Sequence, residues 1–171
     1  MLEKLKNIII NKKLLLISFF IIISLFTIDI LTKRLAFEKV DNIYQKTAGV
    51  HAYIHINNYL NIVKVVNTGV SFGMFRNLKY AQFILSFITI IIISFVLYLL
   101  FNVKTKYKMI TYSLIIAGGL GNIYDRIFFG GVFDFLDFHL GTYHWPAFNV
   151  ADSLICIGVF LLFFEDIFLK K

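Results

Sequence analysis

The chain has 171 residues, which suits a single domain spanning residues 1–171, and 59% of them are hydrophobic, with a mean hydropathy of +0.80. Because a soluble domain is usually about 45–50% apolar, this composition excludes a water-soluble globule and indicates a protein embedded in lipid. The formal net charge of +7 comes mostly from lysines between the apolar stretches and at the chain ends. That distribution fits contact with membrane lipids and argues against a nucleic-acid partner.

Four apolar stretches approach the length needed to cross a bilayer, which is about 20 residues for a helix. They cover residues 14–31, 78–101, 109–129 and 150–169. The third ends in the polar residues Asn122, Asp125 and Arg126, which lower its hydropathy. The pattern predicts an all-α membrane protein with four transmembrane helices.

The first stretch follows Lys12 and Lys13, as the apolar core of a signal peptide would. Its apolar part is too long for a signal peptide, and no small-x-small cleavage site precedes Lys33 and Arg34. We therefore interpret it as a retained signal-anchor helix.

Lysines in the short loops set the expected orientation, because cytoplasmic loops carry an excess of positive charge. They gather before the first span, between the second and third, and at the C-terminus: Lys4, Lys6, Lys12, Lys13, Lys104, Lys106, Lys108, Lys170 and Lys171. The outer segment 34–77 also holds cations, so the inference depends on charge density in the short loops. Both termini are predicted to be cytoplasmic, with segments 34–77 and 130–148 outside.

Within the first outer segment, Asn58–Asn67 is rich in β-branched residues, as strands are. The segment 34–77 is too polar to span the membrane and too apolar for a disordered linker. We predict a small β element on the outer membrane surface and interpret segment 130–148 as an outer loop.

Polar side chains gather at the ends of the spans, where a charge inside the membrane costs about 2.5–3.5 kcal/mol on insertion scales. The set comprises Asp29, Lys33, Asn122, Asp125, Arg126, Asp134, Asp137, Asn149 and Asp152. With both termini inside, all of them fall near the outer interface. Separate helix ends therefore bring carboxylates and amides to one level of the membrane.

Two pairs in this set also have a purely structural interpretation. Asp29 and Lys33 are four residues apart and can pair along one helix face. Asn149 and Asp152 have the spacing of a helix N-cap and its third residue, as in a capping box.

Other members of the set have structural alternatives as well. Asp134 and Asp137 alternate with phenylalanines, which is compatible with a solvated loop carrying aromatic interface anchors. Arg126 can tie the end of the third span to a carbonyl, a carboxylate or a headgroup. Gly118, with the neighbouring Gly119 and Gly121, lets that span approach another helix closely.

The residues needed by other catalytic chemistries are missing. The single cysteine, Cys156, lies in an apolar run and is interpreted as a small buried hydrophobe. The four histidines form no H-E-x-x-H motif or Cys/His cluster, so neither a metal site nor a cofactor is expected. Motifs for a serine nucleophile or a phosphate-binding loop are also absent from the sequence. By elimination, the catalytic chemistry available to this sequence is carboxylate chemistry.

Five short motifs occur in order along the chain: Asp29–Lys33, Asn67–Gly73, Gly118–Arg126, Val132–Phe135 and Phe148–Asp152. In order and in position relative to four spans, they resemble those of the bacterial lipoprotein signal peptidase family, also called signal peptidase II. Each motif is weak alone, but the five together are specific and extend over nearly the whole chain. The outer portion Tyr44–His55 is longer than expected for the family.

This resemblance implies an aspartyl endopeptidase of the bacterial inner membrane whose catalytic pair is Asp134 and Asp152, with Asp125 as the alternative to Asp134. Substrate-orienting or site-supporting roles are implied for Asn67, Asn122, Arg126, Asn149, Asp125, Asp29, Lys33 and Gly118. The implied site lies near the outer face of the membrane. A monomer is expected.

The implied substrate is a lipidated prolipoprotein, cut on the N-terminal side of a diacylglyceryl-modified cysteine. Two carboxyl groups about 3 Å apart cannot both ionise, so such a pair would share one proton and activate water. A small transporter or channel subunit could also use intramembrane acids, but here the acids cluster at one interface and leave no path across the bilayer. A purely structural membrane protein would leave the cluster unexplained.

Overall fold

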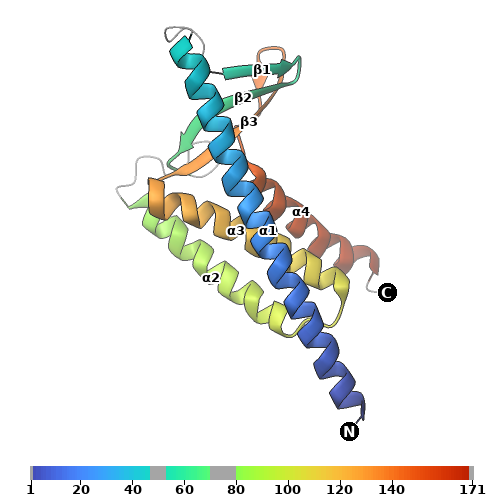
Figure 1. The fold of residues 1–171 in the computed structure, drawn as a ribbon. Coiled ribbons are helices and arrows are strands. Elements are labelled where there is room, and N and C mark those ends of the chain that lie inside the picture. Colours follow the sequence, from blue (N-terminus) through green and yellow to red (C-terminus); the bar gives the residue numbers. More distant parts are fainter. Residues whose placement is uncertain (1, 47–52, 70–79, 170–171) are drawn as a thin grey trace.

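The computed structural model describes residues 2–46, 53–69 and 80–169. Along the chain they form α1 (Leu2–Lys46), β1 (Tyr53–Asn57), β2 (Leu60–Asn67), α2 (Ala81–Phe101), α3 (Lys106–Phe129), β3 (Val132–Leu140), β4 (Tyr143–His144), α4 (Val150–Phe164) and the π-helical turn η2 (Glu165–Leu169). Helix α3 packs against α1, α2 and α4. Figure 1 shows the start of α1 and the end of α4 at one end of this helical bundle and the strands at the other.

The four expected helices are present. Two of them, Lys12–Lys46 within α1 and Ala81–Phe101, are long and apolar enough to cross a membrane. Helix α3 carries the polar residues at its end, and α4 has only 15 residues before η2 begins. Large apolar side chains nevertheless line the outside of the bundle, such as Phe95 and Phe160 at 61% and 64% exposure. Such an exterior suits lipid.

Helix α1 is longer than the predicted span. It continues past residue 31 to Lys46, through part of what was interpreted as a separate outer segment. No glycine or proline interrupts residues 32–46, and the extension is held by packing. Ala36 and Phe37 are buried against Phe135 of β3, so the extended helix becomes a support for the sheet.

The β part is a four-stranded antiparallel sheet in the order β1-β2-β3-β4. The strand expected within Asn58–Asn67 is confirmed as β2, and Asn57 Oδ1 accepts a hydrogen bond from Tyr59 N in the turn before it. The interpretation of segment 130–148 as a loop was wrong, since it forms β3 and β4. Its alternating residues pair with β2, placing Asp134 opposite Val65.

Helix α3 approaches its neighbours closely at its glycines, as predicted. A Cβ atom on Gly118 would overlap the carbonyl oxygen of Ala151 in α4. One on Gly121 would overlap Asp29 Oδ2 of α1 and lie 3.2 Å from Ala151 Cβ. These contacts bring the polar ends of α1, α3 and α4 together.

Some sequence-based expectations lie partly outside the described residues. They concern residues 47–52 of the Tyr44–His55 portion, residues 70–73 of the second motif, the start of the predicted span 78–101, and the terminal lysines Lys170 and Lys171.

Candidate active site

Two carboxyl groups, one buried and one half-buried, meet a single asparagine where the sheet joins the helices. Asp134 comes from β3 and is 1% exposed, whereas Asp152 stands in the first turn of α4. Asn149, fully buried, is the N-cap residue of α4. The short connection from β4 to α4 therefore delivers Asn149 and Asp152 to the side of β3.

Asn149 contacts both carboxylates. Its Nδ2 donates to Asp134 Oδ1 at 2.7 Å. Its Oδ1 accepts from Asp152 N at 2.9 Å, and its own backbone N–H donates to Asp152 Oδ2 at 3.3 Å. The predicted capping box is therefore confirmed, and the same side chain also joins the cap to Asp134.

Each carboxylate receives a further amide donor from a distant part of the chain. Asn67 Nδ2 at the end of β2 donates to Asp134 Oδ2 at 3.0 Å. Asn122 Nδ2 of α3 donates to Asp152 Oδ1 at 2.7 Å. The amides fix the orientation of both carboxyl groups and leave them as acceptors.

The pKa of Asp134 is far from its ordinary value. Burial, and then the negative charge of Asp152, raise the pKa of Asp134 to about 7, although the hydrogen bonds from Asn67 and Asn149 act in the opposite direction. Two interacting carboxyl groups tend to retain one proton between them. This pair can therefore offer a base and an acid together near neutral pH.

A buried ionic cluster lies directly behind the two carboxylates. Lys33 Nζ is 2.7 Å from Asp29 Oδ2 and 2.8 Å from Asp125 Oδ2, and all three residues are at most 2% exposed. The predicted pairing of Asp29 with Lys33 is confirmed. Lys33 Nζ also donates to Asn122 Oδ1 at 3.4 Å, which links the cluster to Asp152 through one amide.

The cluster also anchors the backbone of the neighbouring elements. Asp29 Oδ1 accepts from Ala151 N at 2.8 Å, and Asp125 Oδ2 accepts from Phe133 N at 3.1 Å. Asp125 is thus engaged by Lys33 and by the start of β3. Asn149, which also hydrogen-bonds to Asp152, donates its side-chain amide to Asp134 and not to Asp125. This contact favours Asp134 over Asp125 as the partner of Asp152.

Arg126 and Gly118 have more indirect places around the site. Arg126 Nη1 lies 3.5 Å from the carbonyl oxygen of Asn122, in line with the predicted tie to a backbone carbonyl. Its Nε is buried without a hydrogen-bond partner among the described residues. Gly118 faces the first turn of α4, where it permits the close packing that positions Asp152.

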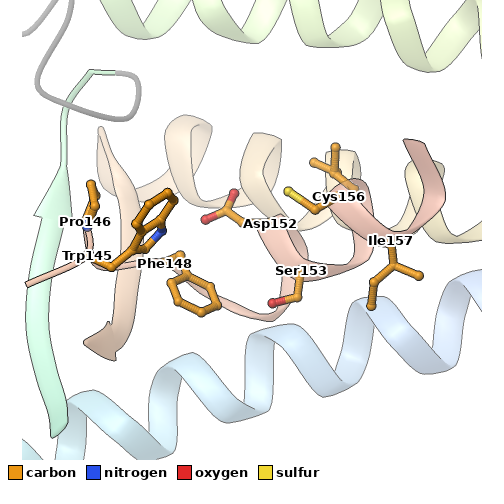
Figure 2. Close-up of a pocket in the computed structure, with 8 residues that line it drawn as sticks. Trp145, Pro146, Phe148, Asp152, Ser153, Cys156 and Ile157 are labelled. Carbon is orange, nitrogen blue, oxygen red and sulfur yellow. The ribbon is translucent and has the colours of Figure 1, made fainter. Parts of the chain in front are cut away.

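A cavity of about 440 Å³ opens at Asp152 (Figure 2). Its walls are mostly apolar and include Trp145 and Phe148 from the connection before α4. Cys156, one turn after Asp152, also lines it and is exposed, so the interpretation of this cysteine as a buried hydrophobe was wrong. A membrane helix can turn an apolar residue toward a cavity or lipid as readily as toward the core.

Asp137 has partners that no sequence motif indicated. Asn61 Nδ2 of β2 donates to Asp137 Oδ2 at 3.0 Å, and His144 Nδ1 of β4 lies 2.8 Å from Asp137 Oδ1. Asp137, the second buried acid of β3, thus ties three strands together. Over the described ranges, no group of three or more His, Cys, Asp or Glu side chains is arranged to hold a metal ion.

Comparison with known proteins gives a consistent match. The family model for signal peptidase (SPase) II matches residues 21–168. The lipoprotein signal peptidase of Thermodesulfovibrio yellowstonii is 43% identical over 155 residues, covering 91% of this chain and 94% of that protein. That of Francisella tularensis subsp. novicida is 36% identical over 157 residues, covering 90% and 92%.

Two solved structures, both described as a bacterial membrane enzyme structure by the in meso method, are also similar. One has a TM-score of 0.70 at 28% identity, covering 88% of this chain and 92% of its own. The other has a TM-score of 0.68 at 30% identity, covering 90% and 91%.

Proposed function

We propose that this chain, which belongs to the signal peptidase II family, is an aspartic peptidase that removes signal peptides from lipoprotein precursors. Its substrates are prolipoproteins carrying a diacylglyceryl-modified cysteine, and the bond cut lies on the N-terminal side of that cysteine. The names of its relatives support this substrate class. No resident cofactor or metal takes part in the proposed reaction.

Asp134 and Asp152 are the proposed catalytic pair. The observation that carries this assignment is the single buried asparagine, Asn149, that hydrogen-bonds to both of them. The position of Asp152 in the wall of a largely apolar cavity also supports the assignment. An extended apolar peptide bound in this cavity would lie beside the carboxylate.

The proposed mechanism uses one proton shared by the two carboxyl groups. The ionised member takes a proton from water as the water oxygen attacks the scissile carbonyl carbon. The protonated member donates a hydrogen bond to the carbonyl oxygen, where negative charge develops. When the C–N bond breaks, a proton from the pair passes to the leaving amine. Because the titration belongs to the pair, neither aspartate is assigned one fixed role.

The surrounding polar residues have positioning roles in this proposal. Asn67 and Asn122 orient one carboxyl group each. Lys33 compensates the negative charge of the buried acids, because it lies against Asp29 and Asp125 and within reach of Asn122. Arg126 and Gly118 act through α3, by securing the position of Asn122 and the packing of α4.

The proposed topology has four spans, with both termini in the cytoplasm and the active site near the outer face of the inner membrane. The chain acts as one domain over residues 1–171 and as a monomer. A reporter that is active only outside the cytoplasm should be silent when fused after Lys171 and active when fused at Lys46. The reverse pattern would refute this topology.

The direct test is incubation of the purified protein with a lipidated precursor and, in parallel, with the same precursor before lipidation. The proposal expects release of the signal peptide from the lipidated form, detected by mass spectrometry, and retention of lipid on the mature protein. Absence of cleavage in a folded preparation would refute it.

A further inference from the structure

A second cavity, of about 680 Å³, lies where the extended end of α1 passes β2 and the junction of α3 with β3. Figure 1 shows this part of α1 running past α3 to the strands. None of its lining residues is shared with the cavity at Asp152. Four of them are charged, two of each sign: Arg34, Glu38, Asp41 and Lys64. We call this cavity the α1 groove.

Two of the four charges in the α1 groove neutralise each other. Lys64 Nζ lies 2.7 Å from Asp41 Oδ2 and 2.8 Å from Asp41 Oδ1. Within the described part of the chain, no ion pair involves Arg34 or Glu38. Arg34 Nη2 makes one long hydrogen bond, 3.4 Å, to Tyr124 Oη. One cation and one anion, a helical turn apart and both exposed, are therefore available to a ligand.

Three phenylalanines, with Asn42 and Val66, make up the rest of the α1 groove. Phe133 stacks on Phe37 at 4.4 Å and on Phe129 at 4.8 Å between ring centroids. Two exposed apolar residues that suit lipid adjoin the lining residues along the chain. Leu31, one turn before Arg34, is 51% exposed, and Phe128 at the end of α3 is 66% exposed. Exposed apolar residues therefore adjoin a groove that carries both aromatic rings and charges.

We propose that the α1 groove binds one phospholipid with a zwitterionic headgroup that carries a primary amine. The phosphate lies at Arg34, whose planar guanidinium suits phosphate oxygens. The ammonium group lies at Glu38 and donates hydrogen bonds to its carboxylate. The acyl chains extend along Leu31 and Phe128 toward the spanning part of the bundle.

Charge complementarity selects this headgroup among membrane lipids. An anionic headgroup without an amine would bring its phosphate to Arg34 but leave the nearby Glu38 carboxylate without a cation, because Lys64 is already paired with Asp41. A quaternary ammonium group has the right charge but no N–H to donate to Glu38. A zwitterionic headgroup with a primary amine satisfies both free charges of the α1 groove, because its phosphate pairs with Arg34 and its ammonium group with Glu38.

The test uses the full-length protein in detergent micelles, without any precursor, so its outcome is independent of the proposed peptidase activity. Native mass spectrometry is recorded with added phosphatidylethanolamine, phosphatidylcholine or phosphatidylglycerol of the same acyl chains. We expect one phosphatidylethanolamine to be retained most strongly. Loss of a charge-assisted hydrogen bond should weaken this binding about tenfold in both Arg34→Gln and Glu38→Gln.

Lys39→Gln is the matched control, because Lys39 is exposed on the same helix and does not line the α1 groove. It should bind phosphatidylethanolamine like the unmodified chain. Equal retention of the three lipids, or unchanged binding by both Arg34→Gln and Glu38→Gln, would overturn the proposal. So would tighter binding of phosphatidylglycerol with no effect of Glu38→Gln, which would indicate a phosphate site alone. Thermal unfolding of each variant checks that the fold is intact, and free phosphoethanolamine should compete only weakly.

Discussion

Replacing Asn149 by serine separates the two contacts that this residue makes. Its side chain caps α4 through Asp152 N and donates an amide hydrogen to Asp134. Serine is also a strong N-cap residue, so the helix start should survive. The shorter hydroxyl cannot cap the helix and reach Asp134 together. We expect Asn149→Ser to cleave the lipidated precursor slowly while keeping its thermal stability.

The expected size of the loss follows from the geometry of the bond to Asp134. It is 2.7 Å long and joins two side chains that are at most 1% exposed. A hydrogen bond to a charged group contributes about 1.5–3 kcal/mol, which corresponds to a fall in turnover of about 10- to 150-fold. Asn149→Ala should lose as much activity and, in addition, about 1 kcal/mol of stability from the missing cap.

The pH profile gives a second readout that a purely structural role would not change. Burial and the Asp152 charge raise the pKa of Asp134 to about 7, and the bond from Asn149 lowers it. Without that bond the proton is held to higher pH, so the alkaline limb of the cleavage profile should move upward in Asn149→Ser. The assay is turnover of a lipidated precursor across pH, beside thermal unfolding. Unchanged turnover, or a loss only in proportion to stability, would refute the bridging role.

Three further predictions follow from the site. Lys33→Met leaves Asp29 and Asp125 buried without their cation and should cost about 3–5 kcal/mol of stability, measured by thermal unfolding against Lys39→Met. Gly121→Ala pushes a methyl group into Asp29 and should cost about 1–3 kcal/mol. Gly119→Ala overlaps only the flexible side chain of Ile93, with Thr89 Cγ2 in ordinary contact, and should cost less in the same assay. In the unmodified protein, cleavage should fall as pH rises through about 7, because the pair then loses its last proton; a profile still rising well above this pH would contradict the shared proton.

Local sequence signals predicted the parts of the structure that depend on near neighbours. The spacing of Asn149 and Asp152 was sufficient for the capping box, and that of Asp29 and Lys33 for their ion pair. The β-branched run ending at Asn67 was sufficient for β2. The capping box and the ion pair are each formed within a few residues of the chain, where spacing determines geometry, and the β-branched content of β2 is likewise a local signal.

Features formed between distant segments were not predictable in the same way. Segment Val132–Leu140 becomes a strand because it pairs with β2, some 70 residues earlier, and this pairing buries Asp134 beside Asn67. The extension of α1 to Lys46 depends on the packing of Phe37 against that same strand. The family resemblance implied roles for the site residues, but it did not reveal that Asn149 contacts both carboxylates.

The central claim, that Asp134 and Asp152 act as one unit, is tested most directly by the cleavage rates of Asp134→Asn, Asp152→Asn and the double variant. Asparagine preserves shape, so each protein should fold and bind the lipidated precursor, with thermal unfolding as the check. Each single variant should lose nearly all activity, and the double variant should be little worse, because residues acting as a unit are non-additive. Asp137→Asn, the control on the same strand, should keep most activity. Strong activity in Asp134→Asn would move the role to Asp125, and strong activity in Asp152→Asn would contradict the two-aspartate mechanism itself.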